Sequence, residues 1–194
     1  MRVPNGLRRA AGVMLAAAAL TSCTATGDTP EQDASEQRAP ASTTYELAPR
    51  PVRPDEVALN GRAVVDGDTS FSLIGLSAHM KTLVGSHVEF EAKGEFARIR
   101  LVVVNVGRSG VLFDTGRQLL VLADGSTRAP DRPTMMVKRQ PDKFDLGAAV
   151  RVEFDLYYDV PENAEPAALR AFGGATLTDM KDAEGTDIPF EPVP

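Results

Sequence analysis

Few side chains in this 194-residue chain could carry out covalent catalysis. A serine nucleophile needs a neighbouring base, and the sequence has two histidines, His79 and His87. The serines next to a glycine, Ser86 and Ser109, do not form the G-x-S-x-G elbow that presents such a nucleophile. We therefore expect both histidines to be loop or strand-face residues, and we predict that the protein is not an enzyme.

Hydrolysis by paired carboxylates stays open as an alternative, because any acidic chain offers such pairs. No pair here is distinguished by an aromatic-rich context, and the chain has no tryptophan on which a sugar could stack. An envelope hydrolase is accordingly the third of three hypotheses for function.

Acidic side chains could supply oxygen ligands to calcium at two places. One is Asp66-Gly67-Asp68, and the other is the acidic tail with Asp179, Asp182, Glu184 and Asp187. Neither has EF-hand spacing, and a hairpin turn explains Asp66-Gly67-Asp68 more simply. One cysteine and two histidines are a poor set of zinc ligands. We expect no metal and no cofactor.

Cys23 is the single cysteine, so it has no disulfide partner in the chain and no second thiolate for metal or redox chemistry. Before it come three arginines, with no acid, and then an apolar run over residues 10–20. At about 11 residues this run is too short to span a bilayer and is typical of a signal peptide.

The tetrapeptide Leu20-Thr21-Ser22-Cys23 resembles the lipobox of bacterial lipoproteins, in which the cysteine is acylated and becomes the mature N-terminus. The resemblance implies that residues 1–22 are a signal peptide that is removed and that Cys23 carries the lipid, with palmitate among its acyl chains. Two acyl chains hold a protein stably on a membrane. We expect a lipoprotein on the extracytoplasmic face of the cell membrane. The alternatives are an ordinary secretory signal with an incidental cysteine and a cytosolic chain with an apolar start.

The charge of the chain argues against nucleic acid as a partner. The formal net charge is −6 at pH 7, and loss of residues 1–22 removes three arginines and no acid. The remaining chain has 18 basic and 27 acidic side chains, a net charge of −9. Such an excess of acid also disfavours a polybasic contact with the membrane.

Residues 24–60 are rich in Thr, Ser, Ala, Glu and Pro and have almost no large apolar side chain. A segment of this kind cannot bury enough surface to offset its ordering entropy. We predict a disordered tether over residues 23–60 with a reach on the order of 30 Å. The folded domain is then expected over residues 61–194.

Residues 61–194 have the periodicity of β-strands. Residues 97–106 alternate Arg98 and Arg100 with Ile99 and Leu101 and then become apolar on both faces, which predicts a central strand. Other patterns predict strands at residues 69–74, 87–92, 117–123 and 151–158, with weaker ones at 168–172, 175–178 and 188–190. No long window has helical periodicity. The fold class is therefore all-β, an antiparallel β-sandwich.

Three stretches together resemble the immunoglobulin-like family called domain of unknown function 4352. They are GEFARIRLVVVNVG at residues 94–107, LLVLADG at 119–125, and GAAVRVEFDLYYDVP at 147–161. Domains of this family occur on secreted proteins and lipoproteins of Gram-positive bacteria. The resemblance implies an immunoglobulin-like sandwich and no established activity, because the motifs it shares are structural.

The most unusual connection in the domain covers residues 129–145 and contains three prolines. It combines the apolar pair Met135 and Met136 with the basic pair Lys138 and Arg139, a combination that could bind an envelope protein. Tyr157 is expected to point away from the core and to join the same exposed surface. The alternative is that the methionines cover one end of the sandwich.

These observations favour a membrane-anchored lipoprotein that displays a non-catalytic immunoglobulin-like domain as a binding or accessory module at the cell envelope. A carrier or sensor of a small ligand or metal ion is the second hypothesis. Site residues under the first hypothesis are Cys23 for lipidation and Met135, Met136, Lys138 and Arg139 for the partner.

Overall fold

We describe a computed structural model of the chain, which covers residues 48, 50–85, 89–177, 180, 182 and 184–193. The elements in chain order are β1 (Val57–Ala58), β2 (Val64–Asp66), β3 (Thr69–Val84), β4 (Glu89–Asn105), β5 (Val111–Asp114), the 3-10 helix η1 (Thr115–Arg117), β6 (Leu119–Leu122), β7 (Thr127–Arg128), α1 (Arg132–Val137), β8 (Lys143–Leu146), β9 (Arg151–Val160), β10 (Pro166–Ala171) and β11 (Thr186–Pro189). Cys23, Ser86 and His87 lie outside the described residues.

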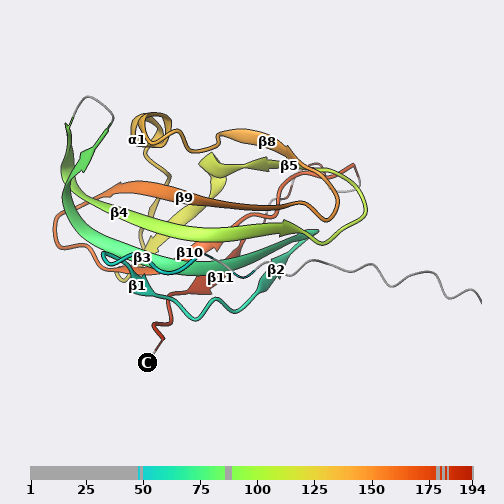
Figure 1. Cartoon of the computed structure of the whole chain (residues 1–194), viewed down its shortest axis with the longest axis horizontal. Coiled ribbons are helices and arrows are strands. Elements are labelled where there is room, and N and C mark those ends of the chain that lie inside the picture. Colours follow the sequence, from blue (N-terminus) through green and yellow to red (C-terminus); the bar gives the residue numbers. More distant parts are fainter. Residues whose placement is uncertain are drawn as a thin grey trace, which may run out of the picture. The chain divides into compact units, whose positions relative to one another are not determined.

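The described strands form two main antiparallel sheets and a short ribbon. In the first sheet the order is β1-β3-β4-β9, and β2 also pairs with β3. In the second sheet the order is β11-β10-β6-β7, and β5 pairs with β8 in the ribbon. Figure 1 shows β3 and β4 as long curved strands that run side by side, with β9 next to β4. The predicted all-β fold of packed antiparallel sheets is confirmed.

Strand β4 is central, as its alternation predicts. It pairs with β3 along one edge and with β9 along the other. Its inward side chains Ile99, Leu101 and Val103 are fully buried in the core. Its Arg98 and Arg100 point to the outer face of the sheet, since successive side chains of a strand alternate between faces.

Side chains from both sheets and the ribbon meet in one hydrophobic core. Phe113 of β5 lies at the centre of an aromatic group, with its ring centroid 6.0 Å from Phe71, 5.4 Å from Phe144 and 6.0 Å from Phe154. These tilted and edge-on pairs are the geometries that aromatic quadrupoles favour. The ribbon is therefore packed into the core through Phe113 and Phe144.

Two local predictions differ from the structure. A strand was expected at residues 175–178, whereas Ala175 makes an isolated bridge with Leu112 and no strand is described there. No helix was expected outside the signal peptide, whereas residues 132–137 form α1. With six residues, α1 is too short to show helical periodicity in a sequence window.

The predicted boundary between tether and domain at residue 61 is wrong for the described residues. Residues 50–56, which we call the strap, lie on the outer face of the first sheet, and β1 follows directly and pairs with β3. The strap lies there because Arg98 and Arg100 offer guanidinium groups to its carbonyls and carboxylates. The folded domain therefore includes residues 50–60.

Candidate binding site beside helix α1

Residues at the two ends of helix α1 determine where the helix begins and ends. The Asp131 carboxylate caps the N-terminus by accepting hydrogen bonds from the Thr134 amide at 3.0 Å and the Thr134 hydroxyl at 2.5 Å. Pro133 in the first turn suits a position whose amide has no partner within the helix. The helix ends before Arg139, which has a left-handed φ of 53°. This connection is therefore an ordered element.

The α1 segment covers the free edge of β9. The Asp131 amide donates to the Tyr157 carbonyl at 2.7 Å, and the Tyr157 amide donates to the Met135 sulfur at 3.4 Å. The Asp155 amide donates to the Gln140 side-chain oxygen at 2.9 Å. The prediction that Tyr157 is exposed is wrong: it is 4% exposed, and burial raises the pKa of its hydroxyl. The covering residues come from about 20 positions earlier in the chain.

A groove of about 600 Å³ lies between α1, η1 and the start of β8. Its apolar part consists of Met135, Met136, Pro130 and Pro141. Met135 is 6% exposed and belongs to the core, whereas Met136 is 74% exposed. The two methionines predicted to act together thus have different surroundings, and only Met136 presents most of its side chain to solvent.

Charged side chains surround the apolar part of the groove. Arg132 lies 3.5 Å from Asp142, and Lys143 lies 3.0 Å from Asp114. The Thr115 hydroxyl links η1 to the residues before β8, because it lies 2.9 Å from the carbonyls of both Pro141 and Asp142. The Arg132–Asp142 pair is largely exposed, so a ligand can replace either partner at little cost, whereas Asp114 of the other pair is mostly buried.

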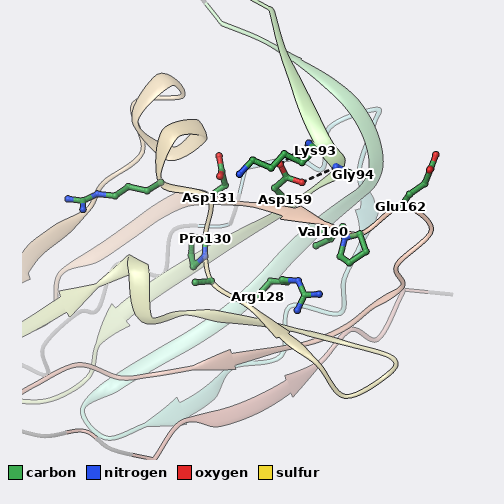
Figure 2. Close-up of a pocket in the computed structure, with 11 residues that line it drawn as sticks. Lys93, Gly94, Arg128, Pro130, Asp131, Asp159, Val160 and Glu162 are labelled. Atoms are coloured by element: carbon green, nitrogen blue, oxygen red, sulfur yellow. Dashed lines mark hydrogen bonds between the residues drawn. The ribbon is translucent and has the colours of Figure 1, made fainter.

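A second hollow of about 480 Å³ lies on the other side of residues 130–132, and Figure 2 shows its lining. The Asp159 carboxylate accepts hydrogen bonds from the amides of Lys93 at 3.0 Å and Gly94 at 3.2 Å. A side chain at Gly94 would collide with the Val160 carbonyl, so glycine permits this close approach of two strands. The hollow shares Pro130 and Arg132 with the groove.

The predicted basic residues lie at the far end of α1. The Lys138 ammonium donates to the Val84 carbonyl at 2.6 Å and lies 5.9 Å from the centroid of the Tyr157 ring. Arg139 is exposed. Neither residue lines the groove, which contains Met135 and Met136 together with Arg132 and Lys143. The short α1 helix turns the two basic residues away, which sequence spacing alone could not show.

The acidic candidates for calcium mostly bind groups of the chain itself. Asp66 accepts hydrogen bonds from the Gly173 amide at 2.6 Å and the Thr186 hydroxyl at 2.8 Å. Asp182 and Asp187 pair with Arg117 and Arg170. Asp179 lies outside the described residues. Across the part of the chain that the structure describes, no group of three or more His, Cys, Asp or Glu could hold a metal ion.

The strap forms an ionic cluster that the sequence did not predict. The Glu56 side chain is fully buried and lies 3.2 Å from the guanidinium groups of Arg53, Arg98 and Arg100. Arg53 also lies 2.9 Å from Asp155. One carboxylate thus joins three arginines. The composition of residues 49–54 suggested a tether, and the partners lie more than 40 positions away along the chain, so no local pattern signals the contact.

A second enclosed carboxylate is Glu95 near the start of β4. Oε2 of Glu95 accepts a hydrogen bond from His79 Nδ1 at 2.8 Å and one from the Asn163 amide at 3.1 Å. The Lys81 ammonium lies 3.0 Å from Oε1. The hydrogen bond from His79, together with Lys81, lowers the pKa of Glu95 to about 2. His79 has a left-handed φ of 57°, so the predicted surface histidine is a constrained partner of this carboxylate.

No protein-family model matches the chain, and no curated protein matches it. Solved structures similar to it include the YjhA protein of Bacillus subtilis, with a TM-score of 0.49, 15% identity, and coverage of 68% of this chain and 97% of the other. Another is MPT63, a secreted protein of Mycobacterium tuberculosis, with a TM-score of 0.42, 13% identity, and coverage of 68% and 93%.

Among the helices of the described residues, none has the length and hydropathy needed to cross a bilayer.

Proposed function

We propose that this chain is a lipid-anchored protein of the bacterial cell envelope whose sandwich domain is a non-catalytic binding module, with the groove beside α1 as its binding surface. The proposal retains membership of the domain of unknown function 4352 family, on the three stretches that resemble it. The mature chain would be held on the extracytoplasmic face of the membrane through Cys23.

The observation that carries the binding role is the exposure of Met136 beside a groove of about 600 Å³ with other apolar lining. An unbranched, polarizable methionine adapts to varied partners. The surrounding ion pairs provide a polar rim, and an apolar centre with a polar rim is the usual anatomy of a protein interface. The wall at Met135 is buried and fixed to β9, so the surface is preformed.

Site-specific photo-crosslinking in intact cells tests the binding role. A photoreactive phenylalanine analogue replaces Met136 in the full-length chain, and the matched control replaces Val65, which is 55% exposed on β2. We expect a discrete crosslinked species from position 136 that is absent at position 65. No adduct at position 136, or the same adducts at both positions, would refute the groove as a binding surface.

The anchor is tested separately with Cys23→Ser. This variant should lose incorporation of labelled fatty acid and move from the membrane fraction to the soluble fraction, because the acyl chains supply the membrane affinity. Equal membrane retention of the variant and the wild type would refute lipid anchoring without touching the binding role.

A carrier of a small ligand is a second candidate, favoured by the groove volume, which falls within the range of about 300–1,000 Å³ typical of ligand sites. Native mass spectrometry of protein purified from its own envelope would then show a bound small molecule. That mass would disappear in a variant with Met136→Arg, which places a charged side chain in the groove.

A further inference from the structure

We propose that Asn60 is a modification site, at which spontaneous deamidation converts the side-chain amide to a carboxylate and loosens the C-terminal residues of the domain. Asn60 and Gly61 lie on the exposed connection between β1 and β2 (Figure 1). The inference concerns a different part of the domain from the α1 groove and does not depend on the proposed function.

The reaction uses the backbone amide that follows the asparagine, and its only co-reactant is water. The Gly61 nitrogen attacks Cγ of Asn60, and the Cγ–Nδ2 bond breaks, so that Nδ2 leaves as ammonia with the proton that Gly61 gives up. Water then opens the resulting succinimide at either carbonyl and leaves aspartate or isoaspartate at position 60. A glycine after the asparagine favours the attack, because it has no Cβ to hinder the approach.

The structure leaves the Gly61 amide available for this attack. Asn60 Oδ1 accepts a hydrogen bond from the Arg62 amide at 2.9 Å, a turn contact that folds the Asn60 side chain toward the residues that follow it. Among the described residues, none accepts a hydrogen bond from the Gly61 amide. Gly61 is also exposed, so water and hydroxide can reach the amide proton.

The other two asparagines of the described residues are held differently. Asn105 is fully buried, and the Val106 amide that follows it donates to a backbone carbonyl at 2.8 Å. The Ala164 amide that follows Asn163 donates to a backbone carbonyl at 3.1 Å. Asn163 is exposed like Asn60, so access to water alone does not distinguish the two positions. The attacking amide distinguishes them, through its hydrogen bond and the side chain beside it.

Deamidation changes a contact between two distant segments of the chain. Asn60 Nδ2 donates to the Glu191 carboxylate at 2.5 Å. Next to this contact, the Val193 amide donates to the Ala58 carbonyl at 3.0 Å. A carboxylate at position 60 cannot donate and faces the Glu191 carboxylate, and like charges on facing segments destabilise their pairing. The modification therefore loosens residues 191–193 from residues 58–60.

The site is tested by peptide mapping with mass spectrometry after incubation of the purified protein in mildly alkaline buffer, which favours loss of the Gly61 amide proton. A parallel sample is unfolded in urea. We expect the folded protein to show at position 60 the mass shift of an –NH₂ group replaced by –OH, with positions 105 and 163 unmodified. Asn60→Gln should lose the shift, because its longer side chain must close a larger ring.

Two results of this mapping would overturn the assignment of the site. The first is a folded protein that remains unmodified at position 60 by the time the urea sample has converted, since the fold would then protect Asn60. The second is equal conversion at positions 60 and 163 of the folded protein, since the hydrogen bond of the Ala164 amide would then make no difference.

The structural consequence is tested by hydrogen exchange at the Val193 amide. Asn60→Asp should make this exchange faster than in wild type, and less so in high salt, which screens the two carboxylates. Adding Glu191→Gln restores an amide opposite a carboxylate and should return the exchange rate toward that of wild type. Asn163→Asp is the matched control and should leave the rate unchanged. Unchanged exchange in Asn60→Asp, or no recovery with Glu191→Gln, would overturn the proposed loosening.

Discussion

The strap on the outer face of the first sheet and the α1 segment beside the groove both contact β9. The two regions differ in how accessible their side chains are to a ligand. On the outer face the strap covers Arg98 and Arg100 of β4, and its buried Glu56 carboxylate binds both of them and Arg53. Asp155 of β9 also binds Arg53. At the groove, the Met136 side chain and the exposed Arg132–Asp142 ion pair remain accessible. A buried ion pair resists the loss of either partner, whereas an exposed pair contributes little to stability. The first region is therefore structural and the second is suited to binding.

The largest expected effect is on the outer face. Glu56→Gln should lower the free energy of unfolding by about 3 kcal/mol, because it leaves Arg98 and Arg100 buried without their shared carboxylate. Urea unfolding measures the change, with Glu89→Gln at the exposed start of β4 as the control. A loss as small as that of the control would mean that the strap lifts off and lets water solvate both arginines.

Substitution of Met135 tests whether this side chain belongs to the core or to the accessible surface of the groove. Met135→Ser should cost about 2–3 kcal/mol, because the side chain is buried and its sulfur accepts from the Tyr157 amide. Met135→Leu keeps the volume and should cost less than about 1.5 kcal/mol. If Met135→Ser unfolded at the same urea concentration as wild type, Met135 would belong to the accessible surface of the groove and not to the core.

Glu95 tests whether a second enclosed carboxylate behaves like Glu56. Its pKa of about 2 lies below the ordinary value of 4.5, so the folded state favours the ionised form. The resulting stabilisation is complete above about pH 4.5 and is lost as the pH falls toward about 2. The melting temperature should therefore fall less steeply with acid in Glu95→Gln than in wild type. If the melting temperatures of the variant and the wild type fell in parallel with pH, Glu95 would contribute nothing to the loss of stability in acid.

The smallest expected effect on stability belongs to the groove. Met136→Ser should change the free energy of unfolding by no more than about 0.5 kcal/mol, because the side chain is 74% exposed. A destabilisation comparable to that of Met135→Ser would remove the contrast between the two methionines.

The sequence predicted the strands whose signals are local. The alternation around Arg98 and Ile99 placed β4, and the apolar run that follows predicted correctly that it is a central strand, paired on both edges. The turn at Asp66-Gly67-Asp68 was predicted correctly as a hairpin between β2 and β3. Each of these features depends on residues within a few positions of one another.

The features that were missed depend on contacts distant in sequence. The alternation along β4 separates Arg98 and Arg100 from its apolar side chains, but nothing nearby indicates that a proline-rich segment more than 40 positions earlier covers them. Tyr157 was assigned correctly to the outward face of β9, yet α1 buries it. Alternation along a strand identifies the face of a side chain and cannot show what lies on that face.

The cover that α1 provides has a consequence for self-association. An open edge strand presents a row of unpaired amides and carbonyls on which another chain can add a strand. The amides of Asp155 and Tyr157 are occupied by Gln140 and Met135, and the Tyr157 carbonyl accepts from the Asp131 amide. β9 is thereby blocked as a template at these positions, so a second copy of the chain cannot extend the first sheet there by adding a strand.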